Sequence, residues 1–122
     1  MKSIIKLMLS FFLILGSADI FACDYPEKIS IPDGNSATKL EMVTTMNNVK
    51  AWVKAIEDYQ ICIEKEEQSS LALLKINGEL TPEVTADIQD FTTRKYNAAA
   101  EDMEKISAEF NAQVRAFNAK GN

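Results

Sequence analysis

The sequence predicts an all-α fold: an antiparallel two-helix hairpin, similar to a coiled coil, with an extended N-terminal arm that a disulfide ties back onto the first helix. Three observations predict this architecture. Two long segments repeat apolar residues at the spacing of a helical seam. A short stretch of turn and cap residues separates them, and a proline-containing segment with one of the two cysteines precedes them.

Residues 1–22 have the order of a secretory signal peptide. Lys2 and Lys6 precede the apolar run 7–15, and small residues follow as far as Ala22. A helix that spans a membrane needs ~20 apolar residues, so this run is too short for one. We therefore expect cleavage near Ala22, a periplasmic or secreted location in a bacterium, and no membrane span once the signal is removed. A retained short membrane anchor is the alternative.

Residues 23–37 are expected to form the extended N-terminal arm. Pro26 and Pro32 each restrict the preceding residue to extended backbone. Turn-forming residues follow at Asp33-Gly34-Asn35-Ser36, just before the helical pattern begins.

Residues 38–122 are expected to form the helical hairpin, with its first helix at about 39–76. Thr38 and Glu41 have the spacing of a capping box, which satisfies free amides at a helix N-terminus. Asn77-Gly78 is a suitable stop, because glycine readily adopts the left-handed conformation of a C-terminal cap.

The second helix is expected at about 82–118. Thr81 can cap it, and Pro82 stands at the first helical position, where its missing N–H costs nothing. Folding the chain about residue 79 places Val53 opposite Ile106 and Ile63 opposite Tyr96. The apolar pattern is weakest at residues 64–70, opposite 88–95, and we predict looser packing there.

The two cysteines predict a disulfide between Cys23 and Cys62, because an exported chain with two cysteines usually pairs them. Cys62 lies about 36 Å along the first helix from Thr38, and the segment from Cys23 to Thr38 reaches up to ~50 Å when extended. Such an arm would bring Tyr25 near Tyr59. The alternative is an outer-membrane lipoprotein lipidated at Cys23, since Ile-Phe-Ala-Cys matches a lipoprotein motif in part.

The composition excludes several kinds of chemistry. The chain contains no histidine, and residues 23–122 hold 11 lysines and arginines against 17 aspartates and glutamates, a net charge of −6. An acidic surface without a basic stripe argues against nucleic acid as a partner. With both cysteines in a disulfide, we expect no catalytic residue, no metal site and no cofactor.

Two acidic clusters are the remaining candidates for acid–base chemistry or calcium binding: Glu64, Glu66 and Glu67, and Glu101, Asp102 and Glu104. Their spacing is that of an ordinary polar helix face, and we interpret both as solvated. Six aromatic residues lie on or beside the apolar stripes and are expected to pack in the core: Trp52, Tyr59, Phe91, Tyr96, Phe110 and Phe117.

The end of the hairpin near the turn holds more apolar residues than one seam can bury. We predict that Leu73, Ile76 and Leu80 are exposed there and contact a partner, because exposed apolar patches often mark contacts. Pairing of two hairpins into a four-helix bundle is a further hypothesis, since two helices make a thin core.

These observations favour an exported interaction or structural protein of the cell envelope, with an unidentified protein partner and no enzymatic activity. A periplasmic holdase-type chaperone that binds unfolded clients is the first alternative. A carboxylate-dependent hydrolase is disfavoured, because two helices offer no obvious concave pocket.

Several short motifs also occur in a fixed order along the chain: Cys-Asp-Tyr-Pro at 23–26, Ile-Pro-Asp-Gly at 31–34, Ala-Thr at 37–38, Glu-Met at 41–42, Tyr59 with Cys62, Tyr-Asn-Ala-Ala at 96–99 and Phe-Asn-Ala-Gln-Val-Arg-Ala-Phe at 110–117. Together they resemble a group of small exported helical proteins of proteobacteria whose function is unknown. The resemblance implies that both cysteines and the Ile-Pro-Asp-Gly segment belong to a common plan. It implies no catalytic residue.

Overall fold

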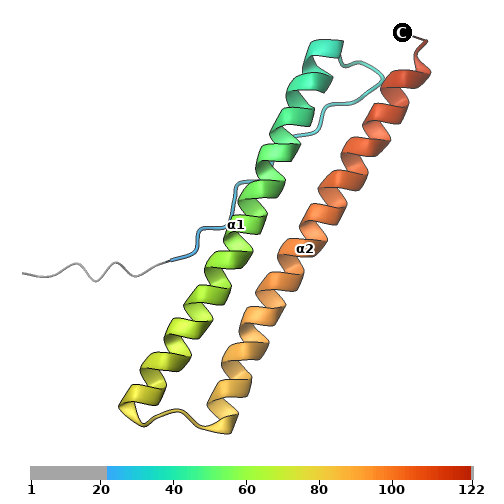
Figure 1. The fold of residues 1–122 in the computed structure, drawn as a ribbon. Coiled ribbons are helices and arrows are strands. Elements are labelled where there is room, and N and C mark those ends of the chain that lie inside the picture. The colour runs from blue at the N-terminus through green and yellow to red at the C-terminus, as the bar shows by residue number, and fades with distance from the viewer. Residues whose placement is uncertain (1–21, 122) are drawn as a thin grey trace, which may run out of the picture.

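The computed structural model describes residues 22–121, which form two long helices and an extended arm. Helix α1 (Lys39–Asn77) and helix α2 (Pro82–Ala119) lie side by side and antiparallel (Figure 1). No strand occurs among the described residues. The arm runs back along α1 from its N-terminal end toward its middle. The predicted fold class is confirmed, and each helix extends one residue beyond the end expected for it.

The helix ends are set by the local signals in the sequence. The backbone N–H of Glu41 donates to Thr38 Oγ1 at 3.2 Å, and the backbone N–H of Thr38 donates back to Glu41 Oε2 at 2.6 Å. Gly78 ends α1 with φ at +73°, the left-handed conformation that favours glycine. Thr81 caps α2 through its side-chain oxygen, with Pro82 in the first turn. The capping box, Gly78, Thr81 and Pro82 thus confirm the predicted start and end of α1 and the predicted start of α2.

The core lies in the middle of the hairpin and is built mainly from one face of α1. Its central cluster of buried side chains consists of Trp52, Ile56, Tyr59 and Ile63 of α1 and Ala99 of α2. The small side chain at Ala99 lets α2 approach the larger side chains of α1 closely. Each large apolar side chain removed from water contributes roughly 1.5–3 kcal/mol, so this cluster is the principal source of tertiary stability.

The register of the helices agrees with the predicted one to within a helical turn. Gln60 Nε2 donates to the backbone oxygen of Tyr96 at 3.2 Å, and Lys95 Nζ lies 3.8 Å from Glu66 Oε2. Val53 and Ile106, expected opposite each other, both pack against the core cluster.

The prediction that all six aromatic residues pack in the core is wrong for two of them. Phe91 is 57% exposed and Tyr96 is 37% exposed. Among the described residues, the arm covers the side of the seam at Tyr59 and leaves Phe91 and Tyr96 uncovered. The helical period correctly predicted which face of α2 carries the apolar stripe, but it overestimated how many side chains of that stripe are buried.

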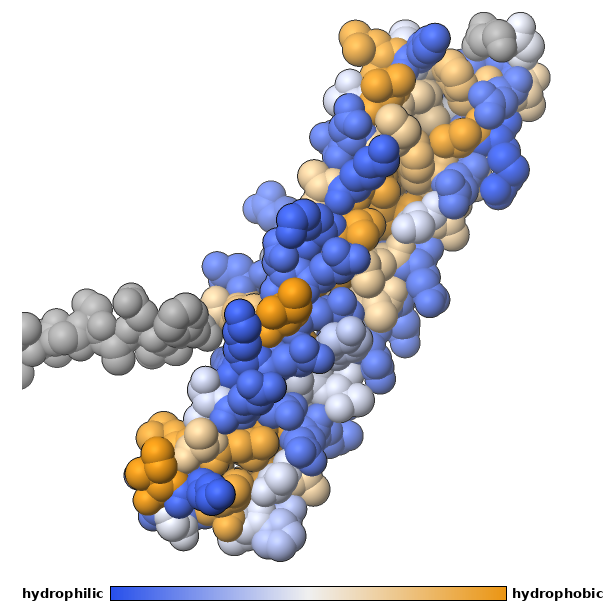
Figure 2. Space-filling model, viewed as in Figure 1, coloured by the Kyte–Doolittle hydropathy of each residue, from blue (hydrophilic) through white to orange (hydrophobic). Residues whose placement is uncertain are grey.

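The described residues differ in polarity along the length of the hairpin. Figure 2 shows hydrophobic side chains gathered at the lower end, over the last turns of α1 and the connection to α2. Neither helix within residues 22–121 has the length of apolar sequence that crossing a bilayer requires. The predicted signal peptide, apart from Ala22, lies outside the described residues.

Candidate functional site: the clamped arm and the groove beyond it

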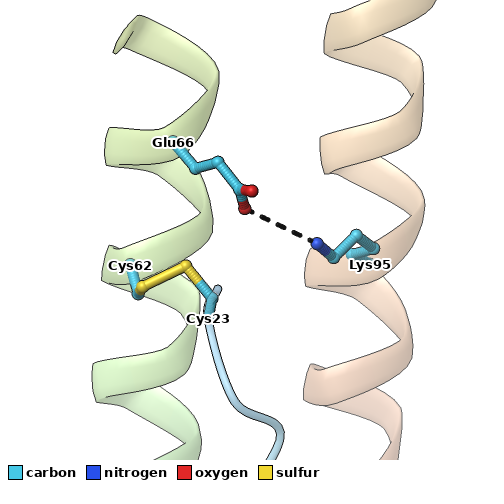
Figure 3. Close-up of a disulfide and its surroundings, with 4 residues drawn as sticks. All are labelled: Cys23, Cys62, Glu66 and Lys95. Carbon is cyan, nitrogen blue, oxygen red and sulfur yellow. Dashed lines mark ion pairs between the residues drawn. A yellow bond between two sulfur atoms is a disulfide. The ribbon is translucent and has the colours of Figure 1, made fainter. Parts of the chain in front are cut away.

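Within residues 22–121, the disulfide between Cys23 and Cys62 divides the hairpin into a half that the arm covers and a half that it leaves uncovered. The two Cα atoms lie 5.7 Å apart, and the bond joins residues separated by 39 positions in the sequence. The predicted pairing is therefore confirmed. Figure 3 shows the arm reaching α1 at this bond from below, whereas Glu66 lies above the bond, on the side away from the arm.

The N-terminal part of the arm is held by both helices. The ring of Tyr25 meets the ring of Tyr59 edge to face, with centroids 5.0 Å apart, as the expected path of the arm predicted. The Tyr25 hydroxyl donates to Asp102 Oδ2 of α2 at 2.8 Å, and Lys28 Nζ lies 4.0 Å from the same oxygen. Ile29 packs against the core cluster. The arm is therefore a third packed element of the structure.

The turn at the other end of the arm also contacts α2. The backbone N–H of Gly34 donates to Gln113 Oε1 at 2.8 Å. A Cβ at Gly34 would lie 2.0 Å from the backbone oxygen of Gln113, so only glycine fits this approach. Lys120 Nζ donates to the backbone oxygen of Ala37 at 2.8 Å. The arm is thus held by three side chains spaced along α2: Asp102, Gln113 and Lys120.

Two tyrosine side chains at the clamp have shifted ionisation. Partial burial, the hydrogen bond to Asp102 and the charge of that carboxylate raise the pKa of Tyr25 to about 12. Burial and the nearby charge of Glu66 raise the pKa of Tyr59. Both hydroxyls are therefore neutral near pH 7, and neither is prepared to act as a base.

A groove of about 300 Å³ opens between the helices beyond the disulfide. Its lining comes from the segment of α1 just past Cys62 and the facing segment of α2: Ile63, Glu66, Glu67, Ser70, Asp87, Ile88, Phe91, Thr92 and Lys95. This is where the weak apolar pattern predicted looser packing, and the groove confirms that prediction.

The groove has an apolar floor and charged edges. Lys95 Nζ lies 5.2 Å from the centroid of the Phe91 ring and 5.9 Å from that of Tyr59, within the range of cation–π contact. The same ammonium group pairs with Glu66 across the helices (Figure 3). Both partners are partly exposed, so this ion pair contributes only about 0–1 kcal/mol. Glu67 and Asp87 add two further negative charges to the lining.

The three residues predicted to contact a partner lie near the turn, with different exposure. Leu73 is 59% exposed and Ile76 is 82% exposed, as predicted, whereas Leu80 is half-buried, so the prediction that it is exposed is wrong. Their role as partner contacts remains a prediction.

The acidic clusters contain no arrangement suited to a metal. Within residues 22–121 no group of three or more cysteine, aspartate or glutamate side chains is placed to hold an ion. Sequence reasoning treated Asp102 as part of a solvated face and missed its role as the acceptor for Tyr25. Gln113 was missed for the same reason, because neither residue differs in type from its polar neighbours on α2.

Comparison with family models, with curated proteins and with solved structures finds no match for this chain. The class of protein is therefore defined by its geometry: a helical hairpin with a disulfide-clamped arm and an uncovered far half. The resemblance to small exported proteobacterial proteins remains a prediction.

Proposed function

We propose that this chain is an exported interaction protein of the bacterial cell envelope, without catalytic activity, and that it contacts its partner through the uncovered half of the hairpin. The observation that carries the proposal is the exposure of large apolar side chains in that half. Leu73, Ile76 and Phe91 are each more than half exposed. An apolar side chain exposed at the surface adds no stability to the isolated chain, and exposed apolar patches often mark protein contacts.

Two features support export to the periplasm or the outside of the cell. Residues 2–22 have the charge, apolar core and small-residue order of a signal peptide. Disulfides persist in oxidising compartments and are rare in the cytosol, and the Cys23–Cys62 bond fits the former.

A binding role rather than catalysis is supported by the chemistry of the side chains. The sequence has no histidine, and its two cysteines are bonded to each other. The carboxylates in the lining of the groove, Glu66, Glu67 and Asp87, therefore have neither a histidine nor a free thiol to act with.

The disulfide also bears on the lipoprotein alternative. A lipid on Cys23 would need the same sulfur atom that is bonded to Cys62. Intact mass of the exported protein distinguishes the two states, since a disulfide removes two hydrogens and lipidation adds a diacylglyceryl group. We expect the former. An added lipid mass would contradict the clamp.

Site-specific photocrosslinking in the living cell tests the proposal. A photoreactive amino acid replaces Leu73, Ile76 or Phe91 in turn, with Lys50 on the polar face of α1 as the matched control position. We expect the same discrete adduct from at least one of the three positions and none from Lys50. Absence of any adduct from all three positions, in a protein that is exported and folded, would contradict an interaction through this half.

The uncovered groove favours one alternative function, a holdase that binds unfolded chains. Its test is the aggregation of a denatured client, followed by light scattering with and without the protein. Suppression at stoichiometric amounts, lost in Phe91→Ala, would favour the holdase. Unchanged aggregation would remove it and leave the proposal of a specific partner.

A further inference from the structure

We propose that the groove beyond the disulfide binds an extended peptide segment of a partner protein in which apolar side chains alternate with lysine or arginine. This inference rests on the proposed function and deepens it, since it names the chemistry of the partner. The argument depends on three observations: the way the arm is bound, the continuity of the arm site with the groove, and the charges at the edges of the groove.

The arm shows how this hairpin binds extended chain. Residues 23–33 have no helical or strand structure, and the arm contacts the helices through side chains and through the backbone groups of Gly34 and Ala37. The Tyr25 ring packs on Tyr59, and its hydroxyl bonds to Asp102 on the other helix. An extended segment with an aromatic or aliphatic residue at intervals can therefore bridge α1 and α2 along the seam.

The groove continues the same surface past the point where the arm begins. Ile63 belongs both to the core cluster that the arm covers and to the lining of the groove. The Tyr59 ring contacts Tyr25 of the arm and also lies near the Lys95 ammonium, 5.9 Å from it. Figure 3 shows Lys95 and Glu66 facing each other between the helices directly beyond the Cys23–Cys62 bond. A partner segment in the groove would thus lie end to end with the arm.

The floor of the groove suits apolar side chains. Phe91 is 57% exposed, and Ile63 and Ile88 lie beside it in the lining. The volume of about 300 Å³ is at the small end of ligand pockets, which fits a few side chains of a peptide better than a folded domain.

The edges of the groove suit a basic partner. Glu66, Glu67 and Asp87 lie in the lining against a single cation, Lys95. Because the Glu66–Lys95 pair is partly exposed and 3.8 Å long, a partner's lysine or arginine can replace Lys95 beside Glu66 at little cost. A second copy of this chain is a poorer occupant, since the chain itself has a net charge of −5 and would bring like charges together.

The test is a binding measurement with a defined probe. The probe is a fluorescein-labelled nonapeptide of alternating valine and lysine with proline at its centre, which disfavours a helix. A control probe has glutamate in place of each lysine. Fluorescence anisotropy with the oxidised full-length mature protein gives the affinity of each probe, at low salt and in 0.5 M salt. We expect the lysine probe to bind, salt to weaken it, and the glutamate probe not to bind at up to about 1 mM.

Variants place the binding in the groove. Phe91→Ala should weaken the lysine probe about tenfold, and Asp87→Lys should weaken it by a similar factor while reducing its dependence on salt. Ile61→Ala is the matched control, because Ile61 is 50% exposed on α1 and does not line the groove. It should leave the affinity unchanged. Thermal unfolding of each variant confirms that all three remain folded.

Three binding results would overturn the inference. These are equal binding of the two probes, an equal loss in Ile61→Ala and Phe91→Ala, and no binding of the lysine probe at up to about 1 mM. Sedimentation showing a dimer that Phe91→Ala abolishes would also overturn it, in favour of a second copy in the groove. If the probes fail while photocrosslinks from Leu73 or Ile76 persist in the cell, this inference is wrong and the proposed function survives.

Discussion

Removal of the Cys23–Cys62 disulfide should cost a large share of the stability of this protein. The bond closes a loop of 39 residues, for which chain entropy gives about 4 kcal/mol at 25 °C. A domain of ~100 residues has a total stability of about 5–15 kcal/mol. The protein should therefore remain folded without the bond, but with a much smaller margin.

The expected change is large enough to measure without ambiguity. A loss of about 4 kcal/mol lowers the Tm by roughly 15–25 °C in a domain of this size. Circular dichroism at 222 nm compares the oxidised protein with the double variant Cys23→Ser, Cys62→Ser. The fluorescence of Trp52, the single tryptophan of the sequence, should shift to longer wavelength as the arm loosens over the core.

The double serine variant also supplies the control. Reductant should lower the Tm of the native protein to that of the variant and should leave the variant unchanged. A difference below about 1 kcal/mol between oxidised protein and variant would refute the reasoning, because it would mean that closing this loop does not restrict the unfolded chain as the entropy argument requires.

Two further predictions concern the arm. Gly34→Ala places a Cβ 2.0 Å from the Gln113 backbone oxygen and should destabilise the fold by about 1–3 kcal/mol in urea unfolding. Gly78→Ala is the control: it has open space around it but a φ of +73°, and it should cost only about 1 kcal/mol. Equal losses in the two variants would contradict a steric cause at Gly34. Tyr25→Phe removes the hydrogen bond to Asp102 and should cost about 0.5–1 kcal/mol at neutral pH, because the bond is exposed. Since the folded-state pKa of Tyr25 is raised to about 12, its contribution is complete below pH ~10 and is lost as the pH rises to about 12. Absorbance titration of tyrosinate should lose its highest step in Tyr25→Phe; loss of a lower step, with the highest step retained, would show that another tyrosine has the raised pKa.

The helix boundaries, the turn and the disulfide could be predicted because each depends on residues close together in the sequence or on very few candidates. The capping box needs only Thr38 and Glu41, and the stop needs only Gly78, so no knowledge of tertiary packing is required. With two cysteines there is only one intramolecular pairing. Two apolar helical stripes of similar length, separated by a short turn, then favour an antiparallel hairpin.

The side chains that hold the arm, and those left open beyond it, could not be predicted in the same way. Asp102 and Gln113 are ordinary polar residues of α2, and their roles depend on which side of the seam the arm occupies. Phe91 and Tyr96 follow the apolar period, yet they remain exposed because nothing among the described residues covers them. A helical period records which direction each side chain points. How much of that face is buried depends on what packs against it, and that is a property of the assembled arm and helices together.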